Sequence, residues 1–103
     1  MNSKGAELLN ERIIADLTGR RKSVNVYCRL VRKTDDYALY SIGTVVTDMT
    51  GEIIFYKDLR DPELIKQAEV YPVRIKHIAS IYIKYKESFS QGVFKEKLAH
   101  EIG

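Results

Sequence analysis

Hydrophobic residues at the start of the chain recur every three or four positions, which places them on one face of a helix. Ser3 can cap the beginning of this helix, and Gly19 lies where a helix commonly ends. The spacing predicts a helix over residues 4–17. Its apolar stripe consists of Ala6, Leu9, Ile13 and Leu17.

Alternation of apolar and polar residues then predicts three antiparallel strands, at residues 23–33, 37–47 and 52–58. In the first of these strands, one face is apolar and the other is polar. The second and third strands are separated by a segment that begins with Asp48 and ends with Gly51, a typical type I turn. We therefore expect a three-stranded meander.

Two more helices are predicted in the second half of the chain. Asp61, Pro62 and Glu63 form a helix start, and the helix has to end before Pro72. Near the C-terminus, Ser88 followed by Gln91 matches a capping box. The apolar residues of this C-terminal helix are Phe94, Leu98 and Ile102.

The segment 73–86 fits two structures. As a strand, it alternates Val73, Ile75 and similar residues with basic ones, and its content of Ile, Val and Tyr favours this interpretation. As a helix, it forms an apolar stripe, and its length favours this alternative. The helical stripe consists of Ile75, Ile78, Ala79, Tyr82, Tyr85 and Phe89.

Length and composition predict a single α+β domain over residues 1–103. With 45% hydrophobic residues, the chain has the material for a core, and no apolar run approaches the roughly 18 residues that span a bilayer. Its one cysteine, Cys28, cannot form an internal disulfide, and the N-terminus lacks the pattern of a secretory signal. We expect a cytoplasmic protein with a buried thiol at Cys28.

Catalytic and cofactor signatures are missing from the sequence. His77 and His100 are far from each other and from Cys28, so no cluster predicts a metal site. No serine lies in a nucleophile elbow, and no glycine pair has the spacing of a phosphate-binding loop. We therefore predict a protein without enzymatic activity, metal or cofactor.

Charge is unevenly distributed along the chain. The net charge is only +3, but ten of the 17 basic residues lie in the stretches 20–33 and 73–86, which contain no acidic residue. Segregation of this kind bears on binding partners rather than on the fold.

The basic stretches predict a binding face if 73–86 is a strand. A right-handed crossover would then bring it beside the strand 23–33. Basic side chains neutralise phosphates and tyrosines stack on bases, so such a face suits single-stranded nucleic acid. The predicted residues are Tyr27, Arg29, Lys33, Arg74, Lys76, Tyr82, Lys84 and Lys86.

Two alternatives stay open at this point. The seven tyrosines of the chain equally suit a protein-interaction or self-association module. The basic residues can also serve only to keep strand surfaces soluble. No membrane partner is expected.

Overall fold

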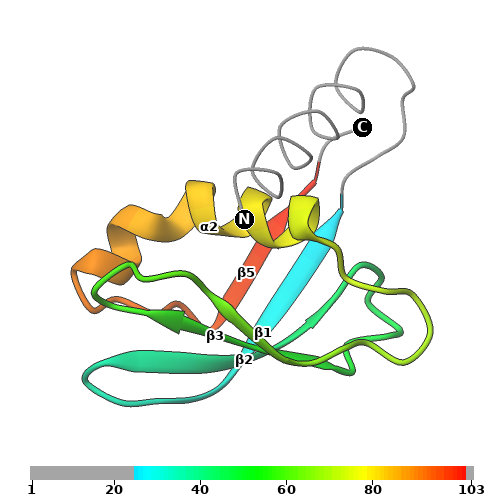
Figure 1. Cartoon of the computed structure of the whole chain (residues 1–103), viewed down its shortest axis with the longest axis horizontal. Helices are drawn as coiled ribbons and strands as arrows, with labels where there is room; N and C mark the ends of the chain where they lie inside the picture. Colours follow the sequence, from blue (N-terminus) through cyan, green and yellow to red (C-terminus); the bar gives the residue numbers. More distant parts are fainter. Residues whose placement is uncertain (1–24, 102–103) are drawn as a thin grey trace.

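A computed structural model describes residues 25–101, which form an antiparallel sheet with a helix packed over one of its faces (Figure 1). The strands are β1 (Val26–Lys33), β2 (Tyr37–Gly43), β3 (Gly51–Tyr56), β4 (Glu63–Lys66) and β5 (Lys97–His100), and the helix is α2 (Ile75–Ser90). The predicted N-terminal helix at 4–17 lies outside the described residues.

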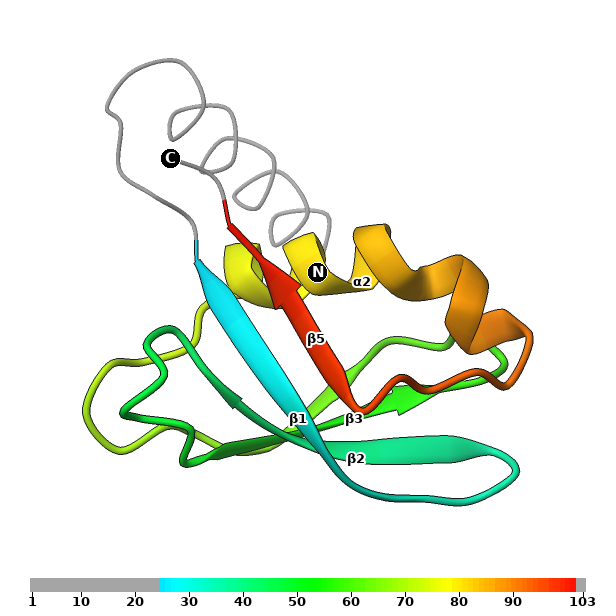
Figure 2. The ribbon, with the colours of Figure 1, turned by 180° about the vertical axis from the view of Figure 1, so that it is seen from behind.

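The five strands are arranged in the order β4-β3-β2-β1-β5, and every neighbouring pair is antiparallel. The strands β1 to β4 follow one another along the chain. The last strand, β5, returns beside the first, so that Val26 is opposite His100 and Cys28 is opposite Leu98 (Figure 2). The two ends of the described segment therefore meet in the sheet.

The strands β1, β2 and β3 form the antiparallel meander that the alternation predicts. The tight turn predicted at Asp48–Gly51 is wrong, because Gly51 is already paired with Ile42 and the connection runs through residues 44–50. A Cβ atom on Gly51 would lie 3.0 Å from both Cγ2 and the carbonyl oxygen of Ile42. Glycine is therefore needed at this position because the strands approach closely, not because of a turn.

The segment 73–86 does not form a fourth strand, since residues 75–90 are helical. The helix ends in a Schellman motif: Gly92 has φ of +76°, its N–H donates to the Phe89 carbonyl at 2.9 Å, and the Val93 N–H donates to the Ser88 carbonyl at 2.9 Å. Packing of the buried Ile81 and Phe89 against the sheet outweighs the strand preference of the many Ile and Tyr residues.

The short helix predicted after Asp61 is also wrong, and β4 takes its place. Leu59, at φ of +64°, reverses the chain just after β3, and its N–H donates to the Tyr56 carbonyl at 3.1 Å. The reversal brings Leu64 opposite Ile53. Ten residues make a marginal helix, whereas the edge of β3 supplies backbone hydrogen-bond partners.

The predicted C-terminal helix is replaced by β5. Ser88 and Gln91, which predicted the capping box of that helix, lie instead at the end of α2. Gly92 ends α2. Phe94 and Leu98 are both buried, as the sequence pattern required. A spacing of four residues places side chains on one face in an extended chain as well as in a helix, so this pattern did not separate the two structures.

The core lies between the sheet and α2 and is rich in aromatic rings. Phe89 stacks on Phe55 and Phe94, with ring centroids 4.8 and 5.5 Å apart. Tyr40 contacts Phe55 edge-on and donates a hydrogen bond of 2.7 Å to the Lys95 carbonyl. This bond attaches the segment between α2 and β5 to the middle of the sheet.

Two side chains hold the connection between β4 and α2. Asp48, which is buried, accepts the N–H groups of Val70 and Tyr71 at 3.0 and 2.7 Å. Gln67 uses its side-chain amide to bond both the N–H and the carbonyl of Val73, at 2.7 and 3.1 Å. The backbone groups of this irregular segment thus find partners without a regular element.

Candidate functional site

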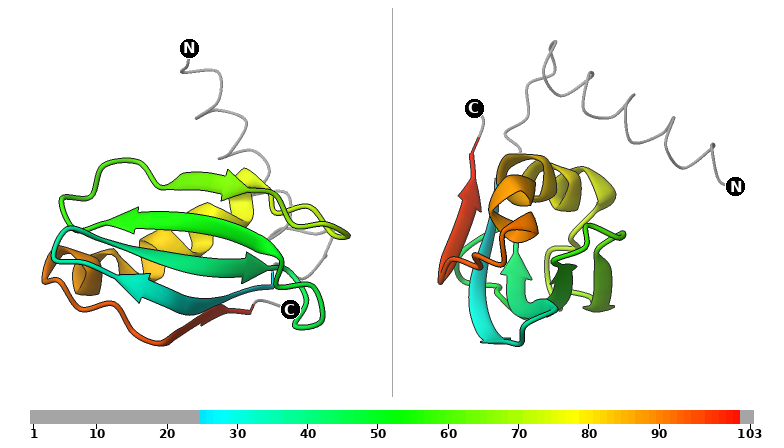
Figure 3. Two further views of the ribbon diagram at one scale, coloured as in Figure 1. Left: turned by 90° about the horizontal axis from the view of Figure 1, so that it is seen from below. Right: turned by 90° about the vertical axis from the view of Figure 1, so that its left-hand side faces the viewer.

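The sheet has one face against α2 and one face that no described helix covers. In the left panel of Figure 3, the strands are seen from this second side, with α2 behind them. Burial alternates accordingly along β2 and β3, where every second residue is buried on the side of the sheet that faces α2. We call the second side the uncovered face. It consists of Tyr27, Arg29, Arg32, Tyr37, Leu39, Ser41, Glu52, Ile54, Tyr56, Glu63, Lys66, Lys97 and Ala99.

The centre of the uncovered face is an apolar pair flanked by opposite charges. Leu39 of β2 lies opposite Ile54 of β3, and both side chains are half-buried. In the same row, Arg32 is the partner of Leu39 on β1, and Glu63 is the partner of Ile54 on β4. Side chains directly opposite each other in antiparallel strands point to the same side of the sheet, so these four form one row.

A polar row lies beside the central row. Ser41 of β2 is between Arg29 of β1 and Glu52 of β3. Lys97 of β5 and Lys66 of β4 form the ends of this row. The row carries three basic residues and one acidic residue, but its acid separates Lys66 from the other two cations.

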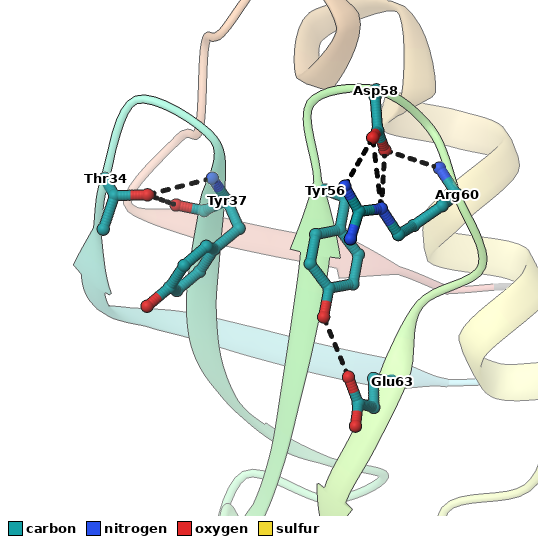
Figure 4. A network of polar contacts seen from close by, with 6 residues as sticks. All are labelled: Thr34, Tyr37, Tyr56, Asp58, Arg60 and Glu63. Carbon is teal, nitrogen blue, oxygen red and sulfur yellow. Dashed lines mark hydrogen bonds and ion pairs between the residues drawn. The ribbon is translucent and has the colours of Figure 1, made fainter.

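A third row contains a tyrosine pair with its own polar network (Figure 4). The rings of Tyr37 and Tyr56 meet edge-on, with centroids 6.2 Å apart. The Arg60 guanidinium covers the Tyr56 ring at 4.4 Å and forms an ion pair of 2.6 Å with Asp58. The Tyr56 hydroxyl donates to Glu63 at 2.8 Å, and this bond raises the pKa of Tyr56.

Tyr27 lies at the opposite end of the uncovered face. Its hydroxyl donates to the Glu101 carboxylate at 2.7 Å, which raises the pKa of Tyr27. A hollow of about 260 Å³ opens beside it, between the β1–β5 pair and the side chains of Val46 and Met49. A second hollow of about 470 Å³ lies at the other end, beside Tyr37 and Tyr56.

Both edges of the sheet are modified in ways that oppose further strand pairing. On β4, the register shifts so that Ile65 has no partner on β3, and an edge strand with a bulge is a poor template. On β5, the Tyr85 hydroxyl bonds both the N–H and the carbonyl of Ala99, each at 3.2 Å. Contact with another molecule is therefore favoured at the face of this sheet rather than at its edges.

The predicted site residues do not form one surface. Tyr27 and Arg29 lie on the uncovered face, as predicted. Lys33 is paired with the buried Ala38, which places it on the other side of the sheet, at the end of β1. Because 73–86 is helical, the remaining residues belong to α2 or its N-cap, across the sheet from Arg29. They are Arg74, Lys76, Tyr82, Lys84 and Lys86.

Tyr82 and Lys84 have contacts that belong to the fold. The Tyr82 hydroxyl donates to the Leu59 carbonyl at 3.0 Å, and its ring packs against the core. Lys84 donates to the Ala99 carbonyl at 2.9 Å. The predicted stacking role of Tyr82 therefore conflicts with its position between α2 and the sheet.

Sequence reasoning missed the centre of the uncovered face. Leu39 and Ile54 are on the less buried side of their strands, and Tyr37 and Tyr56 lie two residues away from them on the same side. The period of two in both strands was a usable signal. It could not be assigned to a face, because Tyr40 and Phe55 give the opposite side of each strand the same apolar and aromatic character.

Within residues 25–101, no group of three or more side chains has the composition and proximity of a metal site. The same part of the chain contains no helix that is long and apolar enough to cross a membrane. Cys28 is a buried free thiol, as predicted, and burial raises its pKa. A buried protonated thiol is a poor nucleophile.

Comparison with protein-family models, with curated proteins and with solved structures finds no match. The function is therefore argued from the residues of the uncovered face themselves.

Proposed function

We propose that this chain is a non-enzymatic protein-binding module and that the uncovered face is its binding surface. One observation carries the proposal: the register brings Leu39 and Ile54 together at the centre of a sheet face that no described helix covers. Tyrosines and charged side chains surround this pair. An apolar centre with a polar rim, enriched in Tyr and Arg, is the composition of protein–protein interfaces.

Charge favours a protein over a nucleic acid as the ligand. A groove for single strands presents basic residues along the backbone and open aromatic faces for the bases. Here Glu52 and Glu63 lie among the basic residues of the uncovered face, and Arg60 already covers the ring of Tyr56. Mixed charge repels part of a phosphate backbone but complements a protein surface.

We also propose a cytoplasmic location. The chain has one cysteine, which is buried and unpaired, so the described fold does not depend on an oxidising compartment.

The binding face is tested by site-specific photocrosslinking in the cells that produce the protein. Tyr37 is replaced by p-benzoylphenylalanine, which keeps an aromatic ring on the uncovered face. The matched control carries the same group at Glu87, an exposed position on α2. We expect covalent protein adducts from position 37 and none from position 87. Equal adducts from both positions, or none from either, would overturn the proposal.

A salt titration separates the nucleic-acid alternative. Labelled single-stranded and duplex oligonucleotides of mixed sequence are titrated with the protein at several salt concentrations. A protein-binding module should not bind them. Binding whose logarithm falls linearly with the logarithm of the salt concentration, and which weakens on Arg29→Ala, would instead favour the nucleic-acid function.

A further inference from the structure

We infer that the partner of the uncovered face is a second copy of this chain, an inference that rests on the binding face proposed above. The two copies are related by a two-fold axis that runs parallel to the strands, between β2 and β3. Both edges of the sheet are blunted, so assembly through edge-to-edge pairing is disfavoured. Two sheet faces can instead pack with their strands nearly aligned.

The central row of the uncovered face is self-complementary about this axis. The order along the row is Arg32, Leu39, Ile54 and Glu63, from β1 to β4. A two-fold rotation between β2 and β3 brings Leu39 onto Ile54 of the second copy, and Arg32 onto Glu63 of the second copy. Each contact then occurs twice, as an isologous interface requires.

The charged pair in this row is available for such a contact. Neither of the ion pairs in the described segment involves Arg32 or Glu63. Glu63 uses its Oε1 atom to accept the bond from Tyr56, and Oε2 accepts no hydrogen bond within the described segment. Sheets packed face to face are rotated by about 30°, and a long arginine side chain can span the resulting offset.

The neighbouring rows are consistent with the same axis, with one mismatch. The rotation brings Tyr37 onto Tyr56 of the second copy, and Ser41 onto Glu52, where the hydroxyl can donate to the carboxylate. It also brings Arg29 near Lys66, which is a contact between like charges. Removal of this repulsion should therefore strengthen the dimer, and a docking surface with another partner would have no reason to respond in that way.

The size of the face indicates a weak, concentration-dependent dimer. Four strands of 8, 7, 6 and 4 residues, at about 3.3 Å per residue and a spacing of about 4.8 Å, give a flat footprint of roughly 400 Å². Standard interfaces bury about 800 Å² per partner. The measurement therefore has to extend from micromolar to near-millimolar protein.

The test is a charge reversal followed by sedimentation equilibrium of the full chain. Arg32→Glu and Glu63→Arg should each raise the dimer dissociation constant by about tenfold or more, because each creates two like-charge contacts per dimer. The double variant Arg32→Glu/Glu63→Arg should recover dimerisation, and Lys66→Glu should lower the dissociation constant. Lys86→Glu on α2 is the matched control and should leave it unchanged. Far-UV circular dichroism verifies that each variant is folded.

The outcomes distinguish this inference from the proposed function. If the chain stays monomeric at all concentrations while Tyr37 crosslinks to a different protein, the second copy is refuted and the binding face stands. If it dimerises but the double variant is no better than either single variant, the proposed axis is refuted. If the chain is monomeric and position 37 gives no adduct, both proposals fail.

Discussion

Replacement of Tyr40 by phenylalanine tests how the segment before β5 is held in place. The phenol of Tyr40 is fully buried, and its hydroxyl donates to the Lys95 carbonyl at 2.7 Å. Tyr40→Phe removes this donor but keeps the ring and its edge-on contact with Phe55, so no cavity of side-chain size is created. The Lys95 carbonyl then loses its hydrogen-bond donor at the edge of the core.

The expected cost follows from these contacts. A typical hydrogen bond contributes about 1 kcal/mol. Lys95 is an exposed residue, so its carbonyl can bond to water once the donor is removed. We therefore expect a loss of about 1 kcal/mol in the free energy of unfolding. Urea denaturation followed by circular dichroism measures this, and the midpoint should fall by roughly 0.5 M with an unchanged slope.

The control is Tyr56→Phe, which removes a hydroxyl that bonds Glu63 at the surface and should leave the unfolding midpoint almost unchanged. The loss of stability at alkaline pH, which is the alkaline branch of the stability profile, gives a second measurement. Burial raises the pKa of Tyr40 above its usual value of about 10. Its stabilising contribution is therefore complete below that pH and is lost as the pH rises above it. A Tyr40→Phe protein as stable as the original, with the same alkaline branch, would refute the reasoning.

Three further predictions concern other parts of the fold. Gly92→Ala should lower stability by about 1 kcal/mol in thermal unfolding, because φ of +76° disfavours a side chain; unchanged stability would mean that α2 ends differently. The N–H groups of Tyr71 and Val70 and the Thr50 hydroxyl lower the pKa of Asp48, so its contribution is present above about pH 4 and is lost as the pH falls through the lowered pKa. When the unfolding midpoint is measured over a pH series, Asp48→Asn should reduce the loss of stability at acidic pH. An unchanged acid dependence would contradict this role of Asp48. Cys28 should react slowly with a thiol reagent until the protein is denatured, and rapid native labelling would place it on the uncovered face.

The sequence predicted the meander because alternation is a direct consequence of strand geometry. The prediction failed where the same residues fit both the spacing of a helix and the spacing of a strand. Phe94 and Leu98 satisfy both a helix and a strand, and the residues that compose α2 have the Ile and Tyr content of a strand. The deciding contacts, such as the stacking of Phe89 on Phe55, join segments more than thirty residues apart and have no local signature.

The candidate site was predictable only in part, for a related reason. Tyr27 and Arg29 were assigned to the polar side of their strand by alternation alone, and the structure places them on the uncovered face. The other predicted residues depended on the structure of 73–86. The apolar centre at Leu39 and Ile54 depended on the register of β2 and β3, because it forms only when these two residues lie opposite each other.

The position of β5 has a consequence for how the chain folds. The backbone N–H and C=O groups on the outer edge of β1 gain partners only when β5 pairs with it. In that pairing Leu98 and Ala99 lie opposite Cys28 and Tyr27, some seventy residues earlier in the chain. Pairing across such a long separation is slow, because the closure of a long loop precedes the gain from the contact. A nascent or truncated chain that ends before β5 keeps the edge of β1 unpaired next to the apolar side chains of Val26 and Cys28. During synthesis, that edge is open to pairing with another chain, a route to aggregation.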